Sequence, residues 1–328
     1  MSNSCPAWLA DSSSFLPWVV GLLCLLSLPT VIWLISYSLP QLYMAFVRRV
    51  PNLKEKYDAK WACVTGGGSG IGKAICFKLA SQGLNVVVVS LDDDYLKQTI
   101  QELSTLYPTQ AFRPVGVTFA PSVNYMEKII EATKDIVVPI VFNNAGFIVT
   151  GFMDQAPLPK LLSNMECNAT ASVNITHHFV QKLVSTKKKG CIVFTSSVAG
   201  FIPTPFAAMY ASTKAFISQF ASCLHIELLG LGIDVCAVHP SPVASNFYDK
   251  VDHKIELMEA AQKTAVPPQT LPNEIFKSIG VCALRDLGGM AVGTRMGTFF
   301  LPYNFFTELF AAAAPMLPDY KNHNKNRH

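Results

Sequence analysis

Charged side chains are absent from a long stretch near the N-terminus of this 328-residue chain. None occurs from Phe15 to Val47, a span longer than the roughly 20 apolar residues that a helix needs to cross a bilayer. The sequence therefore predicts one transmembrane helix. Pro29 lies inside it and is expected to kink the helix or divide it into two pieces.

Lys and Arg are absent before this stretch, so the chain lacks the positive segment that opens a cleaved signal peptide. A membrane anchor is therefore favoured over a signal peptide, which is the main alternative. Basic residues follow the stretch directly, at Arg48, Arg49, Lys54, Lys56 and Lys60. Because Lys and Arg collect on the cytoplasmic side of a membrane, we expect the remainder of the chain to face the cytosol.

Three further absences exclude other classes of protein. The nine cysteines form no C-x-x-C pair and several sit inside apolar runs, which favours buried thiols over disulfides or a zinc site. The net charge is +4, yet no basic stripe interleaved with aromatic residues occurs, so no nucleic-acid partner is expected. No H-x-x-x-H pattern or carboxylate-supported histidine cluster occurs either, so no metal site is predicted.

Beyond the basic residues, short apolar runs alternate with longer helical patterns. Each run is nearly continuous in apolar residues, as strands buried on both faces are. The alternation predicts an α/β fold with a doubly wound parallel sheet, the Rossmann fold. The expected strands are residues 61–64, 85–89, 112–117, 140–142, 191–194 and 234–238, and the expected helices are residues 70–82, 95–106, 125–134, 158–185 and 207–229.

The chain is expected to have three parts: residues 1–47 with the anchor, a basic linker over 48–59, and a folded domain over 60–328. After the last strand the pattern loosens into a polar helical stretch, a proline-rich segment and a helix from Asn273. Residues 297–317 are again apolar. This predicts either a strand followed by an amphipathic helix that covers a hydrophobic pocket, or a second contact with the membrane. Arg295 and Glu308 disfavour a second full span. We therefore expect residues 249–328 to cover the substrate and contact the membrane surface.

A glycine-rich turn, Thr65-Gly66-Gly67-Gly68-Ser69-Gly70-Ile71-Gly72, joins the first expected strand to the first helix. Glycine permits positive φ and lets the backbone approach a pyrophosphate, which binds unpaired N–H groups at a helix N-terminus. The sequence therefore predicts a dinucleotide site here, with Gly66, Ser69, Ile71 and Gly72 in contact with the cofactor.

This turn resembles the T-G-x-x-x-G-x-G signature of the short-chain dehydrogenases. The run Asn143-Asn144-Ala145-Gly146 is similar to the N-N-A-G motif of that family, and the resemblance extends over residues 60–248. It implies NAD(H) or NADP(H) as cofactor, with Asn144 and Gly146 supporting it.

The cofactor preference stays open, because Ser90 stands where NAD-preferring relatives carry Asp and Leu91 where NADP-preferring relatives carry Arg. Three carboxylates at 92–94 would repel a 2′-phosphate, whereas Lys73 would attract one. Thr118 replaces the acidic residue that contacts adenine in the family.

Tyr210 and Lys214 form Y-x-x-x-K on an expected helix, so both side chains emerge on one face. An adjacent ammonium favours the phenolate, and the phenol can then exchange a proton with a ketone or an alcohol. Ser197, thirteen residues before Tyr210, resembles the serine that holds the substrate oxygen in the family, and its spacing favours it over Ser196. Asn168 matches the fourth member of the family set, which holds a water joined to the lysine.

The run His239-Pro240-Ser241-Pro242-Val243 resembles the family segment that touches the nicotinamide, which implies that Val243 makes this contact. Together with the anchor, the resemblance points to relatives in the endoplasmic reticulum membrane: 17β-hydroxysteroid dehydrogenases, very-long-chain 3-oxoacyl-CoA reductases and 3-ketodihydrosphingosine reductases. The expected activity is NAD(P)-dependent reduction of a ketone, or oxidation of an alcohol, on a hydrophobic lipid. The alternative is a catalytically silent member that acts as a membrane scaffold. The resemblance also implies a homodimer through the helix that bears Tyr210.

Overall fold

The computed structural model describes residues 12–249, 251 and 253–324, and it divides into two units, Met1–Arg49 and Val50–His328. The first unit consists of helix α1 (Ser12–Leu42) and a π-helical turn, η2 (Tyr43–Val47). Residues Leu16–Val47 form a candidate membrane span of 32 residues, in which an 18-residue window has a mean hydropathy of 2.3.

The expected division of this helix at Pro29 does not occur, since α1 continues through Pro17, Pro29 and Pro40. Each proline removes one backbone donor, and helices of this kind accommodate that loss by local adjustment.

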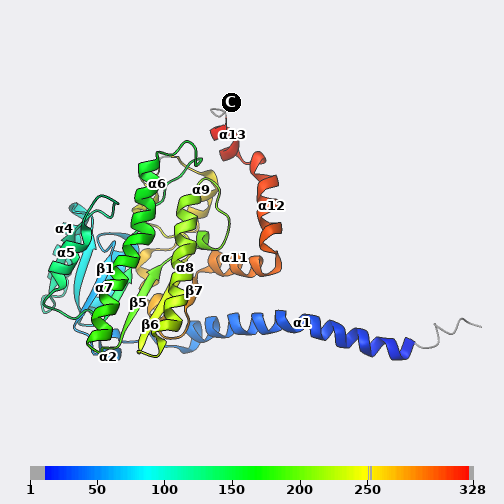
Figure 1. Cartoon of the computed structure of the whole chain (residues 1–328), viewed down its shortest axis with the longest axis horizontal. Helices are drawn as coiled ribbons and strands as arrows, with labels where there is room; N and C mark the ends of the chain where they lie inside the picture. The colour runs from blue at the N-terminus through cyan, green and yellow to red at the C-terminus, as the bar shows by residue number, and fades with distance from the viewer. Residues whose placement is uncertain (1–11, 250, 252, 325–328) are drawn as a thin grey trace, which may run out of the picture. The chain divides into compact units, whose positions relative to one another are not determined.

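A seven-stranded parallel sheet forms the centre of the second unit, with strand order β3-β2-β1-β4-β5-β6-β7 (Figure 1). The predicted doubly wound fold is confirmed, and β1 to β6 correspond to the six expected strands. The strands are β1 (Trp61–Thr65), β2 (Asn85–Ser90), β3 (Phe112–Gly116), β4 (Ile140–Asn143), β5 (Gly190–Thr195), β6 (Ile233–Pro240) and β7 (Leu284–Leu287). We did not expect β7, because Arg285 and Asp286 stand where the other strands have apolar residues.

Helices cover both faces of the sheet, and each face has its own apolar core. One layer contains α2 (Leu53–Lys56), α3 (Gly70–Ser81), α4 (Asp94–Leu106) and α10 (Leu271–Ser278), whose buried residues pack with those of the strands. The opposite layer contains α5 (Tyr125–Thr133), α7 (Ala171–Ser185) and α8 (Ala208–Leu229).

The helix expected over 158–185 has a local irregularity. It consists of α6 (Leu158–Met165), a π-helical turn η3 (Glu166–Thr170) and α7. A π-helical turn widens the backbone by one residue and is frequent at functional sites. Asn168 lies in this turn, and its side chain is buried.

The strand expected at the start of 297–317 is not there, because that segment is helical. It contains the end of α11 (Gly289–Phe300) and all of α12 (Tyr303–Ala313), and α9 (Glu256–Gln262) and α13 (Pro318–Asn324) complete the C-terminal part. Phe306 and Phe310, four residues apart, pack at 4.7 Å between ring centroids, which is helical and not strand spacing. The amphipathic-helix part of the expectation fits α12, on which Tyr303, Phe305 and Leu309 are exposed.

The folded unit begins ten residues before the expected boundary at residue 60, since it starts at Val50. Leu53 and Tyr57, within the expected linker, are buried in the core. The Tyr57 hydroxyl donates to the Asp234 carboxylate at 2.6 Å, and the Lys56 ammonium lies 2.7 Å from the same group. The basic segment is therefore attached to the end of the sheet where β6 begins.

The crevice for a ligand lies where the strand order reverses. The chain leaves β1 toward β2 on one side and leaves β4 toward β5 on the other, so the loops after β1 and β4 diverge at the carboxyl edge. The Thr65 hydroxyl joins the two loops by accepting from the backbone N–H groups of Asn144 and Ala145, both at 3.0 Å.

Candidate active site

The turn after β1 forms a backbone cradle that fits a dinucleotide. Gly66 has a φ of +66°, and a Cβ added to Gly72 would lie 2.1 Å from the Gly66 carbonyl oxygen. The side chain of Ser69, the N-cap of α3, makes no capping hydrogen bond, so it leaves the first N–H groups of the helix for an anion. Ile71 lies in the same first turn. These residues fit the pyrophosphate of a nicotinamide dinucleotide.

Asn144 ties three strand ends together beneath this cradle. Its side-chain amide donates to the Thr65 carbonyl oxygen at 3.2 Å and accepts from the Thr195 hydroxyl at 3.0 Å. Both contacts set the spacing of β1, β4 and β5 at their carboxyl ends. Asn144 therefore links the strand ends beneath the glycine-rich turn.

Near the end of β2, two charged side chains that could influence the choice between NAD(H) and NADP(H) already have partners within the protein. Ser90 lies beside the glycine turn, since a Cβ on Gly68 would meet its hydroxyl at 2.8 Å. Lys73 is paired with Glu102 of α4 at 2.9 Å, so the cation expected to attract a 2′-phosphate already has a carboxylate partner. Asp93 caps α4 by accepting from the Leu96 N–H at 3.1 Å.

Tyr210 and Ser197 meet at the carboxyl end of β5. Ser197 is the second residue after the strand, and its hydroxyl accepts from the Ala199 N–H at 3.2 Å. Burial raises the pKa of Tyr210, and a hydrogen bond from Ser197 opposes that effect. We expected the neighbouring ammonium to stabilise the phenolate, but in the structure burial dominates. The hydroxyl of the alternative, Ser196, points to the Lys214 carbonyl oxygen instead, at 2.8 Å.

Lys214 lies one helical turn beyond Tyr210 and is likewise buried. Its ammonium donates to the Thr195 carbonyl oxygen at 2.7 Å and lies 5.6 Å from the Tyr210 ring centroid. Burial lowers the pKa of Lys214 to about 8. The lysine therefore changes charge close to neutral pH.

Asn168 holds the backbone that follows the N-N-A-G motif. Its side-chain oxygen accepts from the Phe147 N–H at 2.9 Å, and its side-chain nitrogen donates to the Phe147 carbonyl oxygen at 2.9 Å. Gly146 passes between two site residues, because a Cβ there would lie 3.1 Å from the Asn168 oxygen and 3.3 Å from the Lys214 nitrogen. The Asn168 side chain thus fixes the backbone of Phe147, next to Gly146.

The loop after β6 lies beside the glycine turn. Val243 is buried and pairs with Val266 in an isolated parallel bridge. Two residues later, the Ser245 Cβ lies 3.3 Å from a Cβ that would be added to Gly70. Val243 is therefore close to the cradle, in the part of the chain expected to contact the nicotinamide.

An apolar cover closes over Tyr210. Ile148, Ala207 and Tyr210 form a small buried cluster, against which five partly buried residues pack: Ala199, Phe247, Tyr248, Val251 and Met258. The Phe247 ring centroid lies 5.8 Å from that of Tyr210. The residues that follow β6 thus lie over the phenol, where the substrate cover was expected.

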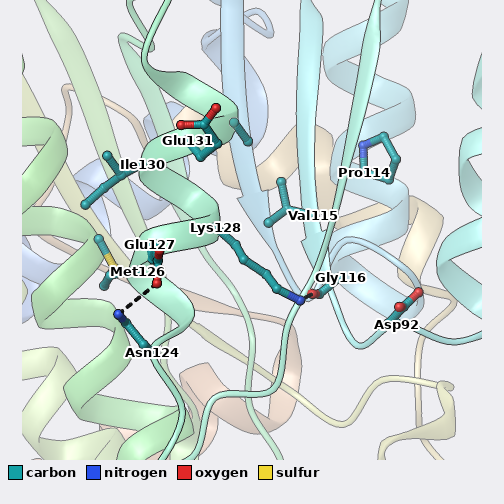
Figure 2. Close-up of a pocket in the computed structure, with 11 residues that line it drawn as sticks. Asp92, Pro114, Val115, Gly116, Asn124, Met126, Glu127, Lys128, Ile130 and Glu131 are labelled. Atoms are coloured by element: carbon teal, nitrogen blue, oxygen red, sulfur yellow. Dashed lines mark hydrogen bonds between the residues drawn. The ribbon is translucent and has the colours of Figure 1, made fainter.

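Two surface hollows lie away from these groups. One is at the sheet edge, between the end of β3 and α5, where Lys128 reaches toward Gly116 and donates to its carbonyl oxygen at 3.1 Å (Figure 2). The other, of about 470 Å³, lies on the face of α8 opposite Tyr210, between Ala211 and Ala311 of α12. Neither hollow is lined by Ser197, Tyr210 or Lys214.

The short chain dehydrogenase family matches residues 60–256, more than half of the chain. This protein belongs to that family. It is an oxidoreductase that acts on CH–OH or C=O groups with a nicotinamide dinucleotide.

Similar proteins include curated enzymes and solved structures. The chain is 29% identical over 226 residues to the very-long-chain 3-oxoacyl-CoA reductase of Bos taurus, covering 68% of this chain and 69% of that protein. It is 30% identical over 231 residues to the 17-beta-hydroxysteroid dehydrogenase type 3 of Rattus norvegicus, covering 69% and 72%. A solved 7beta-hydroxysteroid dehydrogenase shares the fold, with a TM-score of 0.69 at 22% identity over 80% of this chain and 100% of that one.

Sequence reasoning did not find several residues that organise this short-chain dehydrogenase site. Thr65 and Thr195 hold Asn144, and the Thr195 carbonyl also holds Lys214. Thr65 is the first residue of the glycine-rich motif and Thr195 lies two residues before Ser197, and both stand at the last position of a strand. That position is the signal that could have identified them, because the last residue of a parallel strand meets the loops of its neighbours.

Proposed function

We propose that this chain reduces a ketone, or oxidises the corresponding alcohol, on a hydrophobic lipid substrate. The observation that carries the proposal is the burial of Tyr210, with Ser197 beside its hydroxyl, beneath an apolar cover. The cover extends to Phe152, Phe206 and Tyr320, with 5.1 Å between the ring centroids of the first two. Two hydroxyl groups beneath a layer of aromatic side chains suit the carbonyl group of an otherwise apolar substrate. The names of the two curated relatives support a 3-oxoacyl-CoA or a steroid as candidate substrates.

The chemistry divides among three side chains. When bound, NAD(H) or NADP(H) supplies or accepts the hydride at the substrate carbon. In reduction, Ser197 donates a hydrogen bond to the carbonyl oxygen and holds it near the phenol. Tyr210 transfers its proton to that oxygen. Lys214 places a positive charge beneath the tyrosine and stabilises the phenolate that results.

The remaining site residues position these groups and the cofactor. Gly66, Ser69, Ile71 and Gly72 bind the pyrophosphate, and Ser90 contacts the adenosine ribose. Asn144 and Gly146 hold the floor of the crevice, and Val243 contacts the nicotinamide. Asn168 maintains the backbone on which Gly146 approaches the lysine.

Residues 16–47 anchor the enzyme in the endoplasmic reticulum membrane, with the folded unit facing the cytosol. The length of the apolar helix and the basic residues after it support this placement. An anchor suits substrates that partition into lipid. A homodimer through α8 stays a prediction, and Phe216 and Ile226, exposed on that helix, are the apolar residues that it would bury.

The test uses the full-length protein in detergent, with NADH and NADPH side by side and a panel of 3-oxoacyl-CoA, ketosteroid and 3-ketosphinganine substrates. We expect Tyr210→Phe to abolish turnover and to leave cofactor binding, followed by nicotinamide fluorescence, within about twofold. Tyr57→Phe is the matched control, since it also removes a buried hydroxyl, which bonds Asp234 at the start of β6, away from the carboxyl ends of the strands.

Retained turnover in Tyr210→Phe would contradict the assignment of the phenol. A wild-type protein that binds cofactor and reduces no ketone in the panel would favour the scaffold alternative.

A further inference from the structure

A second polar cluster lies behind the catalytic helix, on the side of β6 and β7. His239 of β6 is fully buried, and its Nδ1 atom lies 2.9 Å from the carboxylate of Asp286. Its Nε2 atom lies 2.9 Å from the hydroxyl of Ser218 on α8. The Ser218 hydroxyl is 2.9 Å from the Lys214 carbonyl oxygen and 2.8 Å from the Ser196 hydroxyl. A continuous chain of polar contacts thus connects β7 to the peptide of Lys214.

The charge of His239 follows from its burial. Burial lowers the pKa of His239, so the ring is neutral and carries one N–H. Asp286 accepts only, because hydrogen bonds from His239 and Arg295 outweigh the effect of burial and lower its pKa to about 2. Nδ1 faces the Asp286 carboxylate, and Nε2 faces the Ser218 hydroxyl.

A serine, a histidine and an aspartate in this order resemble a hydrolase triad, but this cluster is not a nucleophilic site. Ser218 faces the sheet from the interior of α8, and its hydroxyl is engaged by His239, Ser196 and the Lys214 carbonyl. Neither surface hollow of the described structure is lined by Ser218. The contacts of Ser218 therefore hold α8 against β6.

Arg295 of α11 closes the cluster on its outer side. Its guanidinium donates to both carboxylate oxygens of Asp286, at 3.0 and 3.2 Å. The same group lies over the Phe201 ring, 3.5 Å from the ring centroid. Phe201 directly follows the 3-10 turn Val198–Gly200 that begins at Ser197. One side chain from α11 therefore contacts both the loop of the catalytic serine and the chain that leads to the catalytic lysine.

Helix α11 has a second attachment to the site. Its Ala291 N–H donates to the Ser241 hydroxyl at 3.0 Å, and the Ser241 N–H donates to the Leu287 carbonyl oxygen at 2.7 Å. Ser241 lies two residues before Val243, in the loop expected to contact the nicotinamide. The N-terminal end of α11 thus holds the loop that contains Ser241, and Arg295 of the same helix contacts the loop that follows Ser197.

We propose that Arg295, Asp286 and His239 are positioning residues through which helix α11 fixes the Ser197 loop and the Lys214 peptide in their active arrangement. This inference rests on the proposed function for its effect on turnover. Reaction rates depend steeply on placement, since a misplacement of about 1 Å can cost a factor of roughly 100. The C-terminal segment is therefore part of the catalytic apparatus as well as a cover for the substrate.

The chain contains a matched control for Arg295. Arg113 in edge strand β3 also makes two hydrogen bonds to one carboxylate, that of Asp135, both at 2.7 Å. It also lies over an aromatic ring, 4.6 Å from the centroid of Trp61. Arg295→Met and Arg113→Met therefore remove the same two kinds of contact beside opposite edges of the sheet, and Arg113→Met also removes a hydrogen bond to the Ala132 carbonyl oxygen. Arg295→Lys keeps the charge beside Asp286 and loses the paired hydrogen bonds.

The experiment compares these variants as full-length proteins in detergent. We expect Arg295→Met to lower kcat by about ten- to hundredfold, to leave the cofactor dissociation constant within twofold, and to be partly rescued in Arg295→Lys. Arg113→Met should leave kcat within twofold. Hydrogen exchange supplies a readout without turnover: peptides covering 195–202 and 208–219 should exchange at least tenfold faster in Arg295→Met and at the wild-type rate in Arg113→Met.

Four results would overturn the proposal: unchanged exchange in those peptides, equal acceleration by the two Met variants, an unaltered kcat, or a cofactor affinity that falls as much as kcat. If Arg295→Met does not fold, Arg295→Lys carries the same comparison. A wild-type protein without ketone turnover would refute the proposed function, while the exchange data would still decide whether α11 holds the Ser197 and Lys214 segments.

Discussion

The buried ammonium of Lys214 makes activity and stability respond to pH in opposite directions. Its pKa is lowered by burial from 10.5 to about 8. In the unfolded chain the amine regains its ordinary pKa, so between pH 8 and 10.5 the unfolded state binds more protons than the folded state. The free energy of unfolding therefore rises with pH across this window. A shift of this size corresponds to on the order of 3 kcal/mol.

The assay compares the melting temperature of the wild type with that of Lys214→Met from pH 7 to pH 10.5. Methionine has a similar length and no charge, so it removes the pH-dependent cost of burying the ammonium. We expect the melting temperature of the wild type relative to the variant to rise by about 5 °C over this range. The offset at one pH also contains the lost hydrogen bond to Thr195, whereas the change with pH does not.

Turnover should change in the other direction. As pH rises through about 8, Lys214 loses the charge that stabilises the phenolate, so kcat/KM for ketone reduction should fall. Lys97→Met is the control, because Lys97 is exposed and its removal should leave both pH profiles unchanged. If the melting temperatures of the wild type and Lys214→Met changed equally with pH, the reasoning would be refuted, since this would show that the lysine does not titrate in this range.

Two predictions concern the cofactor cradle. Gly72→Ala should weaken NAD(P)H binding at least about tenfold in a fluorescence titration, because overpacking typically costs about 1–3 kcal/mol. The new Cβ would lie 2.1 Å from the Gly66 carbonyl oxygen. The control is Gly293→Ala in α11, which has open space around it and should bind NAD(P)H with normal affinity. Leu91→Arg should raise the ratio of kcat/KM for NADPH over NADH by about tenfold, since Arg recognises a 2′-phosphate and Lys73 is already paired with Glu102; an unchanged ratio would place the phosphate elsewhere.

The sequence was sufficient to predict the buried strands, the glycine-rich turn and the Y-x-x-x-K pair, because each is encoded by residues that lie close together in the chain. Strands β1, β2, β4, β5 and β6 are buried apolar runs, and each was predicted within two residues of its observed bounds. The glycine turn and Y-x-x-x-K are short segments whose spacing on a strand end or a helix face determines what their side chains can reach. These features required no knowledge of distant partners.

Strand β7 and the cluster behind it could not be predicted in this way. Arg285 and Asp286 are buried charged residues, and burial of charge requires partners that the local sequence does not show. The partner of Asp286 on β6 is His239, and its partner on α11 is Arg295. The sequence shows His239 only as the first residue of the run that ends at Val243, and the structure places it in the core. Its neighbours became apparent only once the strands were in order.

The end of β5 shows why the catalytic motif alone does not specify the site. Two consecutive residues hold α8 through different atoms: the Thr195 carbonyl oxygen accepts from the Lys214 ammonium, and the Ser196 hydroxyl donates to the Lys214 carbonyl oxygen. A variant that kept Tyr210 and Lys214 but replaced Ser196 would retain the recognisable motif and lose a buried partner of the helix. Because rates depend steeply on placement, the strand end contributes to catalysis as directly as the helix that carries the phenol and the amine.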